Sequence, residues 1–410
     1  MRALILPDAD VLSREHALLA RLEIGLADEG VRVFHGVPRA RVDDTEAWDA
    51  PGVYSRAMPY TAAGLPLTLP VRSAAFVRML ERAVAGEGGK SSAETASTAA
   101  RAVDVVHCFG AGSMRFGLAL ARRCGSAALL EVWNRAGVHA AGRALRRSGL
   151  GGRAMALAPD VRLFEYAQSV LGKKRVQLTP WGVHASEPGP PRVRRAGEPL
   201  TVALVVSAEP AGQTEAAVRD VRAALQGVAF AAAKRPELLV FADAAAALRT
   251  PLARWARELG IESTLTLIPD MESRRELVLQ ADVMLVPQAL GEQRTIVLDA
   301  LGAGMLVAAQ RDELVEAIDA RTGALVLARS DAQAWAAALV GAGWSAERAA
   351  AGRRYVLEER PAYAHALAVV RAYAQIADAR SELNEAVAQQ SRSAASRARA
   401  AAARLTGARP

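Results

Sequence analysis

The side chains whose types and spacing most clearly suggest ligand binding follow an apolar run at 283–286, which is typical of a buried strand. After Pro287 and a short loop, the pattern predicts a helix that begins at Thr295 and Ile296, with Asp299 one turn further on. A helix that begins directly after a strand and a loop presents free backbone N–H groups and the positive end of its dipole. The sequence therefore predicts an anion site at this helix start.

Two interpretations of the nearby acids remain open. Asp299, and Glu292 in the preceding loop, could contact a bound ligand, or they could only complement the dipole of a structural helix. His107 also has two interpretations. It ends a predicted strand at 103–107 and we expect it to face a cleft, where it could hydrogen-bond a substrate; alternatively it is a histidine satisfied by neighbouring backbone.

Two further patterns match phosphate-binding motifs only in part. Gly110-Ala111-Gly112 follows the strand at 103–107 and opens a helix, and Glu131 ends the next strand, as in a dinucleotide site. Arg115 stands where the third glycine of that fingerprint belongs, so a nicotinamide-dependent enzyme is a weaker hypothesis. Gly89-Lys90-Ser91 resembles the end of a phosphate loop, but no strand precedes it, and we interpret it as surface loop.

The elements that position these residues alternate along the chain. Apolar runs typical of strands alternate with amphipathic helical patterns, which favours parallel sheets covered by helices on both faces. The predicted strands are 3–6, 31–34, 103–107, 127–132 and 176–179, then 202–206, 237–241, 264–268, 283–286 and 305–308. Two such sets predict an α/β protein with two Rossmann-like, doubly wound domains, whose strand ends face each other across a cleft.

Composition shifts mark the domain boundaries. Residues 186–197 carry three prolines without periodicity, and the segment 186–199 is predicted to link a first domain, 1–185, to a second, 200–360. A long amphipathic pattern at 361–380 predicts a helix that crosses back to the first domain. The remaining segment, 381–410, is rich in Ala, Arg and Ser, and we expect it to be disordered.

The order of several motifs resembles a known family. Four segments in this order resemble the group 1 (family 4) glycosyltransferases of the GT-B fold. They are the strand Val103-Asp104-Val105-Val106-His107, the segment Leu178-Thr179-Pro180-Trp181-Gly182-Val183-His184, the block from Leu265 to Ala309 and the helix at 361–377. The resemblance implies transfer of a sugar from a nucleotide-diphosphate-sugar donor to an acceptor, with retention, and without a cofactor or metal.

The resemblance also implies roles for individual residues. Asp299, Thr295, Ile296, Asp270 and Ser207 would bind the donor. Glu292, His107 and Arg294 would serve catalysis, with Arg294 as a cation for the leaving diphosphate.

The donor motif departs from the family in two ways. Glu292 and Asp299 are seven residues apart instead of eight, and the segment 207–213 lacks the expected cations. The alternative is therefore a degenerate GT-B scaffold that binds a ligand or partner without transferring a sugar.

Charge and composition bear on partners and location. The 410 residues carry a formal charge of +8, but five arginines lie within 386–410, so nucleic-acid binding is not predicted. Arg143, Arg146, Arg147 and Arg153 predict a basic surface that could meet anionic lipid, where lipid-linked acceptors reside. The two cysteines are not spaced for zinc, and the sequence has no apolar run long enough for a membrane span. We expect a cytoplasmic protein that could lie at the inner membrane surface.

Overall fold

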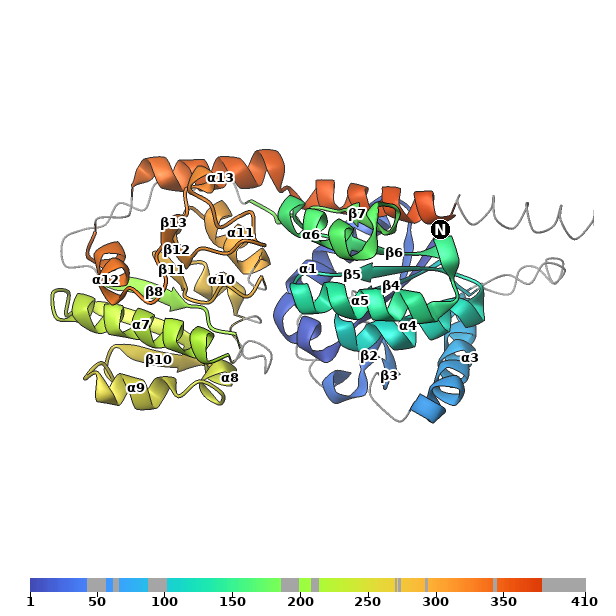
Figure 1. The fold of residues 1–410 in the computed structure, drawn as a ribbon, viewed down its shortest axis with the longest axis horizontal. Helices are drawn as coiled ribbons and strands as arrows, with labels where there is room; N and C mark the ends of the chain where they lie inside the picture. Colours follow the sequence, from blue (N-terminus) through green and yellow to red (C-terminus); the bar gives the residue numbers. More distant parts are fainter. Residues whose placement is uncertain are drawn as a thin grey trace, which may run out of the picture.

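The chain folds into two α/β domains, each built on a parallel sheet, in a computed structural model (Figure 1). The structure describes residues 1–42, 57–61, 66–87, 102–185, 199–207, 214–269, 271, 274–291, 294–341 and 345–377. Residues 186–198 of the predicted linker, the tail at 381–410, Glu292 and Asp270 lie outside these residues. Among the described residues, no helix combines the length and apolarity that a bilayer crossing requires.

The first domain has a seven-stranded sheet in the order β3-β2-β1-β4-β5-β6-β7, with every neighbouring pair parallel. Its strands are β1 Arg2–Pro7, β2 Arg32–Pro38, β3 Met58–Tyr60, β4 Val105–Phe109, β5 Ala127–Glu131, β6 Ala154–Ala158 and β7 Val176–Leu178. Its helices are α1 Ala9–Asp28, α3 Leu69–Glu87, α4 Ala111–Cys124, α5 Arg135–Ser148 and α6 Val161–Leu171.

The second domain has a six-stranded sheet in the order β10-β9-β8-β11-β12-β13, again with parallel neighbours. Its strands are β8 Leu200–Leu204, β9 Leu238–Asp243, β10 Leu265–Ile268, β11 Val283–Val286, β12 Leu306–Gln310 and β13 Leu325–Leu327. Its helices are α7 Glu215–Ala232, α8 Ala244–Ala247, α9 Leu252–Glu258, α10 Arg275–Val278, α11 Thr295–Gly302, α12 Ala332–Val340 and α13 Ala346–Glu359.

Alternating side chains of the central strands fill a core on each face of each sheet. In β1, Leu4 and Leu6 point to one face and Ala3 and Ile5 to the other. Because both faces are covered by helices, the strands are apolar throughout, which explains why they could be recognised in the sequence.

The last described helix, 362–377, returns to the first domain, as the sequence predicted (Figure 1). Its buried side chains, among them Val369, Tyr373 and Ile376, pack with α1 residues such as Leu19 and Leu22 on one face of the first sheet. Helices α3, α4, α5 and α6 contribute to the core on the opposite face. The predicted fold class, two doubly wound domains with a crossing helix, is confirmed.

Candidate functional site

The helix start predicted from the sequence is α11, and Asp299 lies one turn inside it. The Asp299 carboxylate is buried, and it accepts hydrogen bonds from Arg275 Nη1 at 2.7 Å and from Arg21 Nη2 at 2.8 Å. Arg275 belongs to α10 of the same domain, whereas Arg21 comes from α1 of the first domain. Asp299 therefore takes part in an ion-pair network that joins the two domains.

A second carboxylate from the first domain occupies the N-terminus of α11. Glu15 accepts a hydrogen bond from the Thr295 hydroxyl, and Arg275 Nη1 lies 3.0 Å from the same hydroxyl. The backbone of α1 leaves helical geometry at Glu15, with φ −133° and ψ 25°. Burial raises the pKa of the Glu15 carboxyl, against the opposing effect of the Arg275 guanidinium. A carboxyl group of the protein itself thus contacts Thr295, at the helix start where the sequence predicted an anion.

Sequence reasoning identified neither Arg275 nor Arg21 nor Glu15. Arg275 lies twenty-four residues before Asp299, and Arg21 lies 278 residues before it. A buried carboxylate at a helix start predicts a cationic partner in general terms. The sequence contains no signal for which of its many arginines is that partner, because the choice depends on how the two domains dock.

Arg294, predicted as a cation for a leaving diphosphate, is engaged with the protein instead. Its buried guanidinium forms an ion pair with Asp160 of the first domain. It also donates to the carbonyl oxygens of Trp133, Gly291 and Leu314, the last at 2.9 Å. A guanidinium has five N–H donors, and these contacts use four of them. In this arrangement Arg294 stabilises the docking of the domains.

His107 does not face the cleft, which corrects the prediction from sequence. Strand β4 continues two residues beyond it to Phe109, and the imidazole is fully buried. Its Nε2 lies 3.0 Å from the Glu131 carboxylate and its Nδ1 lies 3.0 Å from the Tyr373 hydroxyl. The structure therefore places His107 in the core, under the crossing helix.

The same region removes the support for a dinucleotide site. Glu131, which would have to reach a ribose, is fully buried and also accepts from Trp181 Nε1 at 2.6 Å. At the start of α4, the Asp8 carboxylate accepts from the backbone N–H of Gly112 at 2.9 Å. A Cβ built on Gly110 would lie 2.0 Å from an Asp8 oxygen. A carboxylate fills the place that a pyrophosphate would need.

Ser207 closely follows β8, Ile296 lies in the first turn of α11, and both are buried. The Ser207 N–H donates to the side-chain oxygen of Gln288 at 2.7 Å. Asp270 and Glu292 lie outside the described residues, so their predicted contacts remain predictions. Within the described chain, no group of His, Cys, Asp and Glu side chains is arranged to hold a metal ion.

An open cavity of about 1100 Å³ lies between the domains, at the carboxyl ends of β5, β12 and β13. The first domain contributes residues 134–136 at the start of α5, and the second contributes Thr214 and the segments 289–290, 310–314 and 326–329. Arg311 lines this cavity, is exposed, and has no hydrogen bond or ion pair within the described residues. Arg135, also on the cavity, pairs with Glu313 at 3.1 Å, with both side chains largely exposed.

Comparison with known proteins identifies the fold. No protein family model matches the chain, and no curated protein matches its sequence. Among solved structures, HepE from Anabaena in complex with UDP matches with a TM-score of 0.60 at 10% identity, over 92% of this chain and all of HepE. Sucrose-phosphate synthase from Thermosynechococcus elongatus matches with a TM-score of 0.64 at 16% identity, over 92% and 100% of the two chains.

A third match is WaaG, a glycosyltransferase involved in lipopolysaccharide biosynthesis, with a TM-score of 0.57 at 15% identity, over 90% of this chain and 99% of WaaG. At such low identities the similarities establish the architecture and leave the chemistry to the site. The chain has the GT-B fold, with two parallel-sheet domains and a cleft between them.

Proposed function

We propose that this chain is a glycosyltransferase that takes a sugar from a nucleotide-diphosphate-sugar donor and passes it to an acceptor. The observation that carries the proposal is the cavity between the carboxyl ends of the two sheets, which is the place where doubly wound folds bind ligands. HepE, which shares the fold, binds UDP. We therefore propose a uridine-diphosphate sugar as the donor.

The charges around the cavity support an anionic donor. Arg311, directly after β12, faces it without an ion pair in the described residues, whereas Arg135 at the start of α5 is paired with Glu313. Thr214 is the N-cap of α7, so the positive end of that helix dipole also lies at the cavity wall. A diphosphate that leaves the sugar needs its developing charge stabilised. We assign this role to Arg311 and the α7 N-terminus, in place of Arg294.

The remaining donor contacts belong to the proposal. Asp299, Thr295 and Ile296 would hold the nucleoside once Glu15 and Arg21 withdraw from α11, and Ser207, Asp270 and Glu292 would complete the site. Retention of configuration, independence of a metal, and a cytoplasmic location are further parts of it. We also propose that the basic arginines Arg143, Arg146, Arg147 and Arg153 bring the protein to the inner membrane surface.

A specific observation favours a second candidate, the scaffold without transferase activity. Glu15 contacts Thr295 at the helix start in a buried hydrogen bond, and Arg21 contacts the Asp299 carboxylate that a nucleotide would need in a partly buried one. If this arrangement is permanent, the fold remains while the donor site is closed by the protein's own side chains.

Calorimetric titration of the full chain with UDP, GDP and ADP separates the two. The transferase proposal expects UDP to bind, and expects Arg311→Gln to weaken that binding about tenfold, the loss of one charge-assisted contact. Arg249→Gln, at an exposed arginine of the same domain outside the cavity lining, is the matched control. Release of free sugar or glycoside from a UDP-sugar then reports activity. A chain that binds none of the three nucleotides is the scaffold.

A further inference from the structure

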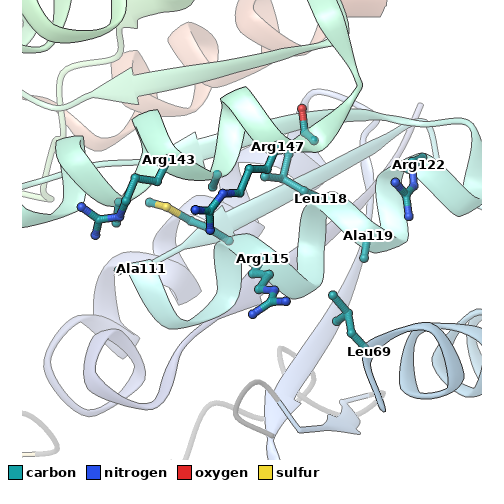
Figure 2. A pocket seen from close by; sticks show the side chains of 12 residues that line it. Leu69, Ala111, Arg115, Leu118, Ala119, Arg122, Arg143 and Arg147 are labelled. Carbon is teal, nitrogen blue, oxygen red and sulfur yellow. The ribbon is translucent and has the colours of Figure 1, made fainter. Parts of the chain in front are cut away.

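We propose that a groove between α4 and α5 binds an anionic phospholipid of a membrane surface. The groove has a volume of about 340 Å³ and runs along one face of each helix (Figure 2). Arg115 and Arg122 border it from α4, and Arg143 and Arg147 border it from α5. The sequence had indicated the two α5 arginines, but the structure adds the two α4 arginines and shows that Arg146 and Arg153 do not line the groove.

The positive charges of the four arginines are not neutralised by any described side chain. All four are exposed, and within the described residues none has a hydrogen bond or an ion pair. The sequences of α4 and α5 contain no Asp or Glu. Guanidinium groups on facing sides of one groove suit a phosphate, because each can donate two parallel hydrogen bonds to its oxygens.

The floor of the groove is aliphatic. It is formed by Met114, Leu118, Ala119, Ala140 and Ala144, with Leu69 on the other side of α4. The segment around Leu69 also exposes two large apolar side chains, since Leu67 is 89% exposed and Val71 is 69% exposed. An aliphatic surface beside a cationic rim matches the boundary between lipid headgroups and acyl chains.

The same features disfavour a nucleic acid as the occupant. Proteins that bind single strands combine cations with aromatic side chains on which the bases stack. Among the described residues, none that lines this groove is aromatic. We therefore assign the phosphate to a lipid headgroup, with Leu67 and Val71 entering the interfacial layer of the membrane.

The role of this site rests on the proposed function, because a glycosyltransferase held at a membrane meets acceptors that are linked to lipids. The groove includes Ala111 at the start of α4, which lies at the carboxyl edge of the first sheet. That edge faces the second domain, so a lipid bound here lies in the half of the molecule that would receive the acceptor.

The test is flotation of the full chain with vesicles of phosphatidylcholine alone or mixed with phosphatidylglycerol, at physiological salt. We expect binding only to the mixed vesicles. Each arginine near an anionic membrane contributes about a fivefold gain in affinity, so Arg115→Gln, Arg143→Gln and Arg147→Gln together should weaken binding about a hundredfold. The control replaces Lys173, Lys174 and Arg175, three exposed cations of the same domain outside the groove, by Gln.

The outcomes are distinct. An equal loss in both triple variants would show binding by net charge alone and would overturn the groove. The proposal would also be overturned if the chain did not bind the mixed vesicles but bound an RNA oligomer, and the groove variant lost that RNA binding. Weaker binding of Leu67→Ser with Val71→Ser would support insertion. Titration of the parent chain with UDP is a separate readout, because failure of the parent to bind UDP would refute the proposed function and leave the vesicle result standing.

Discussion

At the scale of single residues, the burial of Asp299 raises the stability loss expected when this carboxylate is replaced. Asp299 has 3% of its side chain exposed and contacts two arginines that are themselves largely buried. If Asp299 served only the helix dipole, its replacement would cost less than about 1 kcal/mol. Removal of one partner from a buried ion pair costs more, because an uncompensated charge remains inside the protein.

We therefore predict that Asp299→Asn lowers the free energy of unfolding by about 3 kcal/mol, as measured by urea denaturation. Glu347→Gln is the matched control, because Glu347 is an exposed acid in the first turn of α13 without such partners. It should cost less than about 1 kcal/mol. Equal small effects at both positions would mean that Asp299 only complements its helix.

A buried histidine should make stability fall in acid. Burial lowers the pKa of His365 to about 3 from 6.5, and nearby His107 and Arg360 add to the effect. Below pH 6.5 the His365 imidazole is protonated in the unfolded chain, whereas in the folded protein its pKa of about 3 keeps it neutral. Stability therefore decreases as the pH falls through this window, by about 1.4 kcal/mol per pH unit from this group.

His365→Phe should remove that contribution, so the difference in unfolding free energy between pH 6 and pH 4.5 becomes smaller than in the parent chain. Urea unfolding at several pH values measures it. His184→Gln, at an exposed histidine, should retain the pH dependence of the parent. If His365→Phe retains it too, the proton is taken up elsewhere.

At the scale of elements, the close approach of α1 to the crossing helix holds the helix 362–377 on the first domain. A Cβ added at Gly25 of α1 would lie 2.5 Å from the Cβ of Ala366. Side chains on the two helices, such as Leu22 and Val369, are buried together. Glycine at position 25 therefore serves helix packing, in spite of its low helix propensity.

We predict that Gly25→Ala destabilises the protein by about 1–3 kcal/mol, because the overpacked contact outweighs the gain in propensity. The double variant Gly25→Ala with Ala366→Gly moves the methyl group to the opposite helix and should recover most of the loss. Thermal unfolding of the single and double variants checks this. A single variant as stable as the parent would show that the helices separate freely.

At the scale of the whole molecule, buried arginines from the second half of the chain fasten the domains together. Arg294 pairs with Asp160, and Arg360 donates to the same carboxylate at 3.2 Å and to the Pro159 carbonyl at 2.9 Å. By contrast, the Arg135–Glu313 pair across the cleft is exposed and should contribute little.

We predict that Arg294→Gln uncouples the domains, so that calorimetric unfolding separates into two transitions and the first comes at a lower temperature. The buried Asp160 loses a partner, which typically costs about 3–5 kcal/mol. Arg135→Gln removes a cation that also bridges the domains but is exposed, and should leave a single transition at nearly the parent temperature. If the two variants behave alike, the domains are held by other contacts.

The sequence by itself determined the architecture, because the signals for it are local. Parallel strands buried on both faces must be apolar throughout, and that pattern identified most strands and the helix start at Thr295. The apolar pattern did not identify three short or atypical strands, β3, β6 and β13. In β6, Ala-Met-Ala-Leu-Ala has the composition of a helix, whereas β3 and β13 are edge strands of three residues each. Such segments form strands because they pair with neighbouring strands of the sheet, and the local sequence does not show this pairing.

Only the tertiary structure decided which side chains contact Asp299 and Thr295 at the start of α11. Asp299 meets Arg21 from a position 278 residues away, and Thr295 meets Glu15 from 280 residues away. Such pairs depend on the angle at which two separately folded domains dock, which local patterning does not encode. The sequence predicted an anion site at the start of α11, and the domain contacts decided that the Glu15 carboxyl contacts Thr295 there.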